Sequence, residues 1–272
     1  MNLSKKPKMP KIWGILNLTP DSFYDGGRYI GLDKALARGI QLAEEGADVI
    51  DVGGESTRPG AEKIDENEEL RRIIPVIANL SEMLTIPISV DTYKARVAEK
   101  AFLAGATILN DISGLTFDPE MKNVIAKWDF PFVIMHIQGI PKNMQIEPHY
   151  TDVTIELKEY FLARLNQLES ANVNINNAIL DPGIGFGKLL EHNMGIFKSL
   201  DKFIELGHPI MIGASRKSFL PRLINLPLEV EERLSPSLAV AAHCYFRGVE
   251  YLRVHDVKDT KIFLQTLSEL LY

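Results

Sequence analysis

Short apolar runs rich in β-branched residues alternate along the chain with longer segments that have helical hydrophobic spacing. The runs occupy residues 12–17, 48–53, 87–90, 107–110, 131–136, 178–181, 209–213 and 250–255. Strands that alternate with helices form a parallel sheet, and eight such units close into a barrel of about 250 residues. The chain has 272 residues and no linker-like stretch. We therefore expect an α/β fold, with a single (β/α)₈ TIM barrel domain spanning residues 1–272.

A polar or glycine-rich segment follows each of these runs. In chain order the segments read NLTPDSFYDGG, GGESTRPG, DTYK, NDISG, MHIQG, DPGIGFGK, GASRKSF and RVHD. The carboxyl ends of the strands in a parallel barrel share one face, so segments far apart in the sequence meet there. We expect the active site at the C-terminal ends of the strands.

Charge and cysteine content exclude several classes of partner. The formal net charge is −6 and no block of Lys or Arg stands out, which argues against nucleic acid or an anionic membrane surface. The apolar run WGIL near the amino end is too short for a signal-peptide core or a membrane span. The single cysteine, Cys244, lies in an apolar stretch that favours a buried, inert thiol. We expect a cytoplasmic protein that binds neither nucleic acid nor membrane.

Two prolines give local expectations about helices. Asp118 supplies a capping acceptor immediately before Pro119, which suits the first position of a helix. Pro75 falls inside the helical stripe formed by Leu70, Ile73 and neighbouring apolar residues. Because proline lacks a backbone donor, we predict that Pro75 kinks or interrupts that helix.

The motifs after the runs are specific enough to indicate a family. NLTPDSF, DVGGESTRPG, DPGIGFGK and GASRKSF, with SVDTYK, LNDISG, IMHIQG and RVHDV in the expected order, resemble the dihydropteroate synthases over almost the whole chain. The resemblance implies a transferase of folate biosynthesis. Such an enzyme condenses 6-hydroxymethyl-7,8-dihydropterin diphosphate with p-aminobenzoate, giving 7,8-dihydropteroate and diphosphate. It also implies a homodimer that uses Mg²⁺ and binds these small-molecule substrates.

A pterin ring presents two adjacent donors and a carbonyl acceptor, so its pocket needs a carboxylate and a cationic or amide donor. Asp181 can accept from both donors, and Lys217 can donate to the carbonyl or the neighbouring ring nitrogen. The pocket would also include Asp91, Asn110 and, as an apolar wall, Met135. The alternatives are loop capping for the two aspartates and core packing for Met135. Convergence of four polar groups at strand ends favours the pocket.

The diphosphate needs anion donors. Arg253 and His255 are two residues apart on the last strand and can address one ligand. The resemblance implies that they form the anion pocket with Asn17, which would also be a ligand of Mg²⁺, a cation that prefers oxygen donors. Arg216 is a further basic candidate. The alternatives are a surface ion pair of Arg253 with Asp256 and a structural role for His255.

The resemblance places p-aminobenzoate among residues of the first two loops and of the segments after the sixth and seventh runs. These residues are Phe23, Thr57, Pro59, Phe186, Lys217 and Ser218. Arg58 can pair with Asp25 or with the ligand, and Asp25 is a candidate proton acceptor. The alternative for both loops is that they are simple polar connectors; loops of this kind can also order over a ligand and exclude water.

The expected catalytic set is Asp25, Arg58, Lys217, Arg253 and His255. We favour a dissociative, SN1-like route, because an electron-rich pterin can delocalise the cation left when diphosphate departs. One alternative is a pterin-dependent methyltransferase domain, against which TPDSF and SRKSF argue. The other is a catalytically silent pterin-binding protein, which would be expected to lose its anion-pocket residues. The fold alone cannot choose among them.

Overall fold

A computed structural model describes residues 6–19 and 28–272 of the chain. Its strands form one parallel sheet in the order β6-β5-β4-β3-β2-β1-β8-β7. They are β1 (Lys11–Asn17), β2 (Val49–Gly53), β3 (Ile88–Asp91), β4 (Ile108–Asp111), β5 (Phe132–Met135), β6 (Ala178–Asp181), β7 (Met211–Ile212) and β8 (Tyr251–Val254). A parallel bridge between Leu180 and Ile210 joins the two outer strands. The predicted eight-stranded barrel is confirmed.

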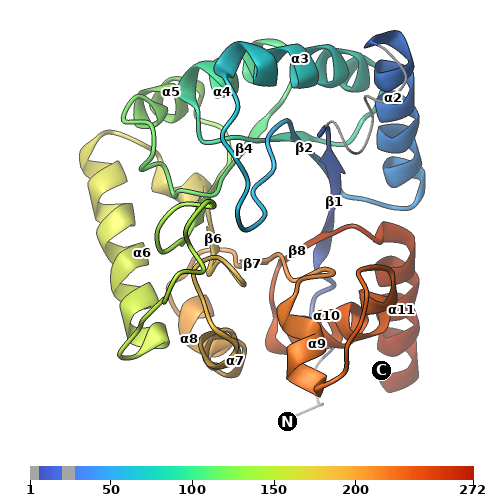
Figure 1. Cartoon of the computed structure of the whole chain (residues 1–272), viewed down its shortest axis with the longest axis vertical. Coiled ribbons are helices and arrows are strands. Elements are labelled where there is room, and N and C mark those ends of the chain that lie inside the picture. Colours follow the sequence, from blue (N-terminus) through green and yellow to red (C-terminus); the bar gives the residue numbers. More distant parts are fainter. Residues whose placement is uncertain (1–5, 20–27) are drawn as a thin grey trace.

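Helices surround this ring of strands in chain order, as Figure 1 shows. They are α2 (Arg28–Glu44), α3 (Glu66–Met83), α4 (Ala95–Leu103), α5 (Met121–Trp128), α6 (Val153–Ser170), α7 (Leu190–Lys198), α8 (Leu200–Ile204), α9 (Phe219–Ile224), α10 (Leu234–Arg247) and α11 (Val257–Leu271). Two short 3₁₀ turns, η1 (Ile175–Asn177) and η2 (Glu231–Arg233), precede β6 and α10. Within the described ranges, no helix combines the length and the apolar character needed to cross a bilayer.

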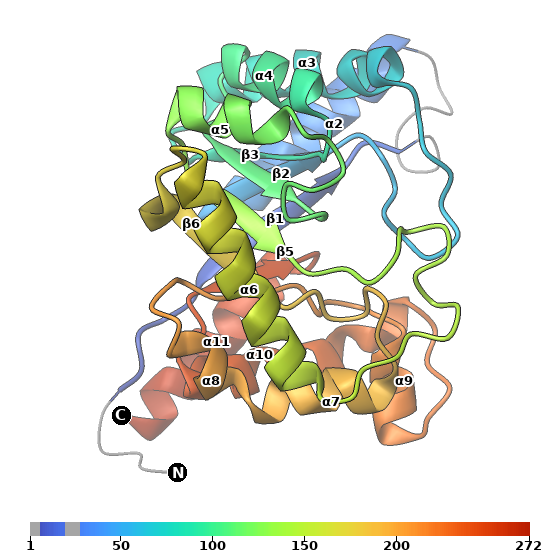
Figure 2. The ribbon, with the colours of Figure 1, turned by 90° about the vertical axis from the view of Figure 1, so that its left-hand side faces the viewer.

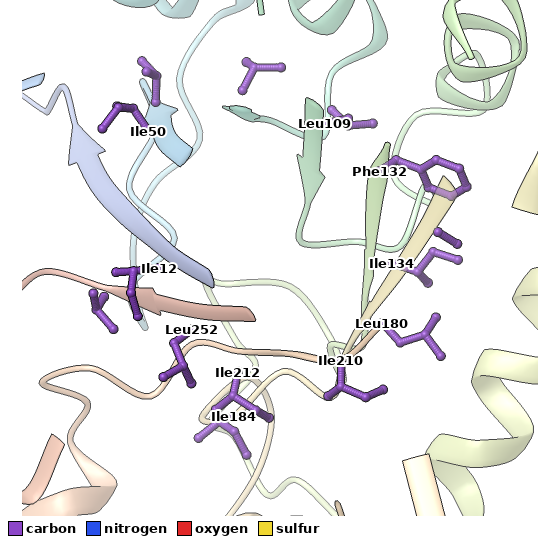
Figure 3. Close-up of a cluster of buried hydrophobic side chains, with 14 of the residues drawn as sticks. Ile12, Ile50, Leu109, Phe132, Ile134, Leu180, Ile184, Ile210, Ile212 and Leu252 are labelled. Carbon is purple, nitrogen blue, oxygen red and sulfur yellow. The ribbon is translucent and has the colours of Figure 1, made fainter. Parts of the chain in front are cut away.

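Alternation along the strands gives the barrel two apolar layers, because successive side chains point to opposite faces. The outward side chains, among them Ile50, Leu109 and Leu252, belong to one buried cluster with apolar residues of the helices. Figure 3 shows how these strand side chains lie around the ring of strands. The inward side chains of the first strand positions form a separate buried cluster of Trp13, Val49, Ile108, Val133, Ile179 and Met211. Full burial of each such side chain stabilises the fold by about 1.5–3 kcal/mol. The amino-terminal half of the interior is therefore closed, and only the carboxyl-terminal half can hold a ligand.

Helix α3 runs from Glu66 to Met83 without a break, so Pro75 does not interrupt it, and the kink predicted as the other outcome stays a prediction. Pro75 is exposed, whereas Ile73, Val76 and Leu80 on the other side of the helix are buried. Packing of that apolar face outweighs the loss of one backbone donor on the exposed side.

The caps at Asp118 differ in detail from the expectation. One carboxylate oxygen of Asp118 accepts from the backbone N–H of Glu120 at 3.0 Å, as a capping residue should. Helix α5 begins only at Met121, however, so Pro119 precedes the helix instead of occupying its first position. The other oxygen of Asp118 accepts from the N–H of Ala95, the first residue of α4, at 2.8 Å. One side chain thus anchors two successive helix starts.

The expectation for Cys244 is confirmed. Its side chain is fully buried in α10, and burial raises the pKa of the thiol far above its usual range. A protonated, inaccessible thiol is a poor nucleophile.

Candidate active site

The side chain of Arg253, at the end of β8, donates to two carboxylates inside the barrel. Its Nε lies 2.6 Å from Oδ2 of Asp51 on β2, and its Nη2 lies 2.7 Å from Oδ2 of Asp91 on β3. Strands β1 and β2 separate β8 from β3, so these groups meet across the interior. The alternative of a surface ion pair with Asp256 is wrong, because Asp256 accepts from Nε and Nη2 of Arg216 at 2.8 and 2.6 Å.

Asp51 is a site residue that sequence reasoning missed. It is fully buried, and its Oδ2 also accepts from Nδ2 of Asn110 at 3.0 Å. Its Oδ1 has no hydrogen-bond partner among the described residues. One carboxylate therefore orients both Asn110 and Arg253. The available signal was an aspartate in the middle of the apolar strand VIDVG, because a charge buried there requires a partner across the barrel.

Burial is the largest influence on the pKa values of Asp91 and Arg253 in this ion cluster. It raises the pKa of the Asp91 carboxyl to about 7, while Arg253 opposes the shift and Asp51 adds to it. Burial alone would lower the pKa of Arg253, but the two carboxylates outweigh it and raise that pKa. One guanidinium thus neutralises at most one of two adjacent carboxylates, so the cluster favours a ligand that brings hydrogen-bond donors.

Asp181 and Lys217 form the second polar group, on the opposite part of the ring. Oδ1 of Asp181 accepts from the N–H of Gly183 at 2.7 Å. The Lys217 ammonium donates to the carbonyl of Ile184 at 2.5 Å and lies 4.4 Å from the ring centre of Phe186. Burial raises the pKa of Asp181 and lowers that of Lys217 to about 8, and each group opposes the shift of the other. The structure therefore brings these three predicted residues together.

Gly183 permits this arrangement. Its φ is +69°, and a Cβ there would lie 2.0 Å from the carbonyl oxygen of His136. A residue with a side chain would have to move the segment after β6 away from the segment after β5. The glycine therefore sets the spacing of the pocket wall that carries Phe186.

Lys188 is a second residue that sequence reasoning missed. It is buried, and its ammonium donates to the carbonyls of His136 and Phe186 at 3.2 and 3.0 Å and lies 3.0 Å from Nδ1 of His136. Burial lowers the pKa of Lys188 well below its usual value and that of His136 to about 2. A neutral imidazole can accept from the ammonium, so Lys188 joins the segments after β5 and β6. The final Lys of DPGIGFGK was the only sequence signal.

Two of the predicted anion-binding residues, Asn17 and His255, lie at the ends of the neighbouring strands β1 and β8. Nδ1 of His255 lies 3.1 Å from Oγ of Ser215, which also accepts from the backbone N–H of His255 at 3.2 Å. Burial lowers the pKa of His255 to about 4, and the positive charges of Arg253 and Arg58 contribute. Arg58, from the β2–α3 segment, is exposed and makes a smaller contribution than Arg253. A neutral His255 can donate one hydrogen bond to an anion.

Asn17 ends β1 beside Asp91. A Cβ built on Gly53 would lie 3.5 Å from Oδ1 of Asn17 and 3.5 Å from Oδ2 of Asp91, so the glycine separates the two oxygens without filling the space. Among the residues that the structure describes, no group of three His, Cys, Asp or Glu could hold a metal. A single amide oxygen suits Mg²⁺ only if substrate phosphates and waters complete its shell. The donors present therefore fit a Mg²⁺ that arrives with the diphosphate.

The residues expected around p-aminobenzoate come from separate segments. Thr57 is half-buried, Pro59 and Ser218 are exposed, and Phe23 lies outside the described residues, as does Asp25. Met135 is buried in a cluster that includes Tyr93 and Ile112, with Phe186 packed against it. Both expectations for Met135, pocket wall and core, are compatible with this position.

The segment that carries Thr57 and Pro59 runs beside the segment after β5, and Figure 2 shows the two together at the open face of the barrel. The N–H of Gly60 donates to the carbonyl of Pro141 at 3.0 Å. Lys142 and Glu62 form an exposed ion pair at 2.9 Å. The segment that carries Thr57 and Pro59 therefore lies over the mouth of the barrel.

A model of the pterin binding enzyme family matches residues 13–255. The chain belongs to this family. The match includes every strand from β2 to β8 and almost all of β1. It therefore includes the polar residues described above, namely Asp51, Asp91, Asn110, Asp181, Lys217 and Arg253.

Individual relatives of the chain within this family carry a more specific description. The chain is 42% identical to a dihydropteroate synthase of Bacillus subtilis over 260 residues, which cover 96% of this chain and 88% of the relative. It is 39% identical to the Xanthomonas albilineans dihydropteroate synthase solved with 4-aminobenzoic acid, with a TM-score of 0.89 and coverage of 99% and 94% of the two chains. A structure of the Xanthomonas albilineans enzyme in complex with 7,8-dihydropteroate is 36% identical, with a TM-score of 0.85 and coverage of 99% and 95%.

Proposed function

We propose that this protein catalyses dihydropteroate synthesis in folate biosynthesis. It joins 6-hydroxymethyl-7,8-dihydropterin diphosphate to p-aminobenzoate and releases diphosphate, as a transferase of the pterinylmethyl group. The observation that carries the proposal is the convergence of Asp91, Asn110, Asp181, Lys217 and Arg253 in one polar ring at the open face of the barrel. The relatives described above include dihydropteroate synthases with bound p-aminobenzoate and bound product.

The polar ring binds the pterin. The carboxylate of Asp181, which has one oxygen fixed by Gly183, accepts from the adjacent ring donors. The Lys217 ammonium donates to the ring carbonyl or the neighbouring nitrogen, and Asn110 and Asp91 bind further edge atoms. These groups are fixed before the substrate arrives, because each already has protein partners.

The leaving diphosphate lies between Asn17, Arg253 and His255. When Mg²⁺ is bound with it, the cation neutralises charge that develops on the departing oxygens. In the SN1-like route, the bond between the pterin methylene and the bridging oxygen breaks, and the diphosphate takes the electron pair. Arg253 and a neutral His255 donate to the anion.

The arylamine then attacks the methylene. Its nitrogen supplies the electron pair of the new C–N bond and afterwards loses a proton, for which Asp25 is the candidate acceptor. Phe186, Pro59 and Phe23 would enclose the aromatic ring, and Ser218 would meet its carboxylate near the start of α9. Thr57 and Arg58 complete the enclosure and exclude water, which would otherwise hydrolyse the activated pterin.

The reaction can be tested with purified protein, the pterin diphosphate, MgCl₂ and p-aminobenzoate, with both products followed. We expect dihydropteroate and diphosphate in equal amounts, without any corrinoid. A folded protein that leaves both substrates intact would refute the proposal and favour the silent pterin-binding alternative. The SN1-like route is tested separately by labelling the bridging oxygen with ¹⁸O. If the label never moves to the other oxygens without p-aminobenzoate, and no pterin intermediate accumulates with an unreactive arylamine analogue, the case for the dissociative step is weakened.

We further propose a cytoplasmic homodimer whose metal is Mg²⁺. Sedimentation at micromolar concentration should give about twice the chain mass. Removal of divalent cations with a chelator should abolish turnover, and Mg²⁺ should restore it.

A further inference from the structure

The ammonium of Lys94 lies just after β3 and has three acceptors. It donates to Oε2 of Glu55 and to Oε2 of Glu69, each at 2.6 Å, and to the carbonyl oxygen of Ile64 at 2.9 Å. A lysine ammonium has three donors, so each of them is used. The side chains of Lys94, Glu55 and Glu69 are only 11%, 7% and 1% exposed, so this cluster is shielded from solvent.

Two of these acceptors lie at opposite ends of the β2–α3 segment. Glu55 follows the glycine pair at the end of β2, and Ile64 lies just before the cap of α3. The ends are also joined directly, because the N–H of Ile64 donates to Oε2 of Glu55 at 3.1 Å. The hydroxyl of Tyr93 donates to the other oxygen of Glu55 at 2.6 Å. Four hydrogen bonds therefore close the base of the segment.

The third acceptor fixes this base to the barrel. Glu69 lies on α3, and a Cβ on Gly54 would be 3.0 Å from Cγ of Glu69 and 2.8 Å from Cγ2 of Ile73. The backbone after β2 thus passes directly over the side chain that holds Lys94. Burial acts to lower the pKa of Lys94, but the hydrogen bonds to Glu55 and Glu69 outweigh it and raise that pKa. The ammonium remains charged.

The part of the segment between these ends has much weaker support. Arg58, Pro59 and Gly60 are exposed, and the segment touches the β5–α6 segment through one backbone hydrogen bond and the exposed pair of Lys142 and Glu62. A tip of this kind takes its position from its base.

We infer that Lys94 is a positioning residue for the second substrate: through Glu55 and Ile64 it fixes the base of the 55–64 segment and thereby places Thr57 and Pro59 over the arylamine. The inference rests on the proposed function for the identity of that substrate. It assigns no contact between Lys94 and either substrate. Loss of Lys94 should weaken the binding of the arylamine and leave the binding of the pterin unchanged, because Asp91, Asn110 and Asp181 keep their own partners.

The test compares two variants that share one substitution. Glu69→Gln keeps an acceptor for Lys94 and keeps both contacts to the 55–64 segment, so it is the control. Lys94→Met combined with Glu69→Gln removes those contacts without leaving the buried Glu69 carboxylate unpaired. The measurements are the KM for p-aminobenzoate, kcat, the Kd of the pterin diphosphate, and amide hydrogen exchange of peptides covering 55–64.

Relative to the control, the double variant should raise the KM for p-aminobenzoate about tenfold, the order expected when a positioning element is displaced. The Kd of the pterin diphosphate should stay within about twofold, and exchange should accelerate in 55–64 alone. An unchanged KM with unchanged exchange overturns the inference. So does an equal weakening of both substrates, which would indicate a general structural role.

A second pair covers the case in which the double variant does not fold. Tyr93→Phe removes the other donor to Glu55. Tyr245→Phe is the control, because it removes a buried hydroxyl on α10 that donates to Ser268 of α11 at 3.1 Å and has no contact with the 55–64 segment. Tyr93→Phe should raise the KM for p-aminobenzoate about threefold, while Tyr245→Phe leaves it unchanged; equal effects overturn the inference.

Failure of the inference and failure of the proposed function are distinguishable. If the unsubstituted protein makes no dihydropteroate, the proposed function is wrong, and the exchange measurement still tests whether Lys94 fixes the segment. If it makes dihydropteroate and the variants show no selective effect, only the positioning role is wrong.

Discussion

The floor of the barrel mouth and the β2–α3 segment are built in opposite ways. On the floor, Asp51, Asp91, Asn110 and Arg253 lie on four different strands and are joined by buried and partly buried hydrogen bonds of 2.6–3.0 Å. The segment over it is fixed at its base by Lys94 but has an exposed tip. A ligand that binds the floor meets groups already in place, whereas one enclosed by the tip must order it.

This difference assigns the two substrates to two kinds of surface. The pterin needs several directed hydrogen bonds, and rigid strands supply them. The arylamine offers an aromatic face and a carboxylate, for which apolar side chains on a loop suffice. We therefore expect pterin binding to be independent of p-aminobenzoate and to come first.

The largest effect is expected on the floor, for Lys217→Ala. The substitution removes the only predicted cationic donor to the pterin and the positive charge that acts most strongly on Asp181. We expect kcat/KM to fall by about 10³-fold or more, because an unpaired polar group in a hydrogen-bonding site discriminates strongly. Pterin binding measured by calorimetry should fall in parallel. Lys127→Ala, at an exposed ion pair with Glu99, is the control, and retained pterin affinity in the Lys217 variant would contradict the assignment.

Arg253→Met should have the largest effect on stability. It leaves the carboxylates of Asp51 and Asp91 buried beside each other without a counter-charge. The free energy of unfolding should fall by about 3–5 kcal/mol, the usual result of removing one partner of a buried ion pair. Chemical denaturation of the variant and the parent measures this. A loss below about 1 kcal/mol would mean that Asp91 takes up a proton or that water reaches the cluster, and repeating the denaturation at pH 9 distinguishes the two.

As pH rises above 8, activity should fall while the contribution of Lys217 to the free energy of unfolding rises. Burial lowers the pKa of Lys217 to about 8, so the donor ammonium is lost as pH rises through 8, and kcat/KM for the pterin diphosphate should then decline by up to about tenfold per pH unit. In the unfolded chain the lysine keeps its proton up to about 10.4. Between these values the unfolded state binds more protons, so the Lys217 contribution makes the free energy of unfolding rise with pH. Lys217→Met should remove this rise, and a rise that persists must come from another group.

The smallest effect is expected where the β5–α6 segment meets the β2–α3 segment, for Lys142→Met. Lys142 and Glu62 are 62% and 75% exposed, so loss of their ion pair should change the free energy of unfolding by at most about 1 kcal/mol. Comparison with Arg253→Met measures how much more a buried ion pair contributes than an exposed one in the same protein. A loss similar to that of Arg253→Met would show that the tip is as firmly held as the floor.

The sequence was enough to predict that the site residues lie close together, because that depends only on the parallel direction of the strands. Asp91, Asn110 and Asp181 all occur at the carboxyl ends of strands, and a parallel barrel has one carboxyl face. The positions of Arg253 and His255 follow from the same rule. Only the family resemblance linked these positions to a pterin, since the barrel hosts many reactions.

The pairing of charges was not predictable. Lys94 and Lys188 pair with neighbouring segments, and Asp51 pairs with an arginine across the barrel; these partners depend on the finished fold, and local spacing carries no such information. The continuity of α3 through Pro75 likewise depends on packing against its neighbours. Phe23 and Asp25, predicted for the arylamine and its proton, lie outside the described residues and stay predictions.

The link from Arg253 to Asp51 spans 202 positions of sequence, and the link to Asp91 spans 162. During synthesis the ribosome delivers the two aspartates long before their counter-charge, since chains grow at about 5–20 residues per second. The carboxylates of Asp51 and Asp91 must therefore stay hydrated or protonated until β8 packs beside β1. We expect a truncated chain that ends before β8 to bind the pterin weakly, because it lacks the guanidinium that pairs with Asp51 and Asp91.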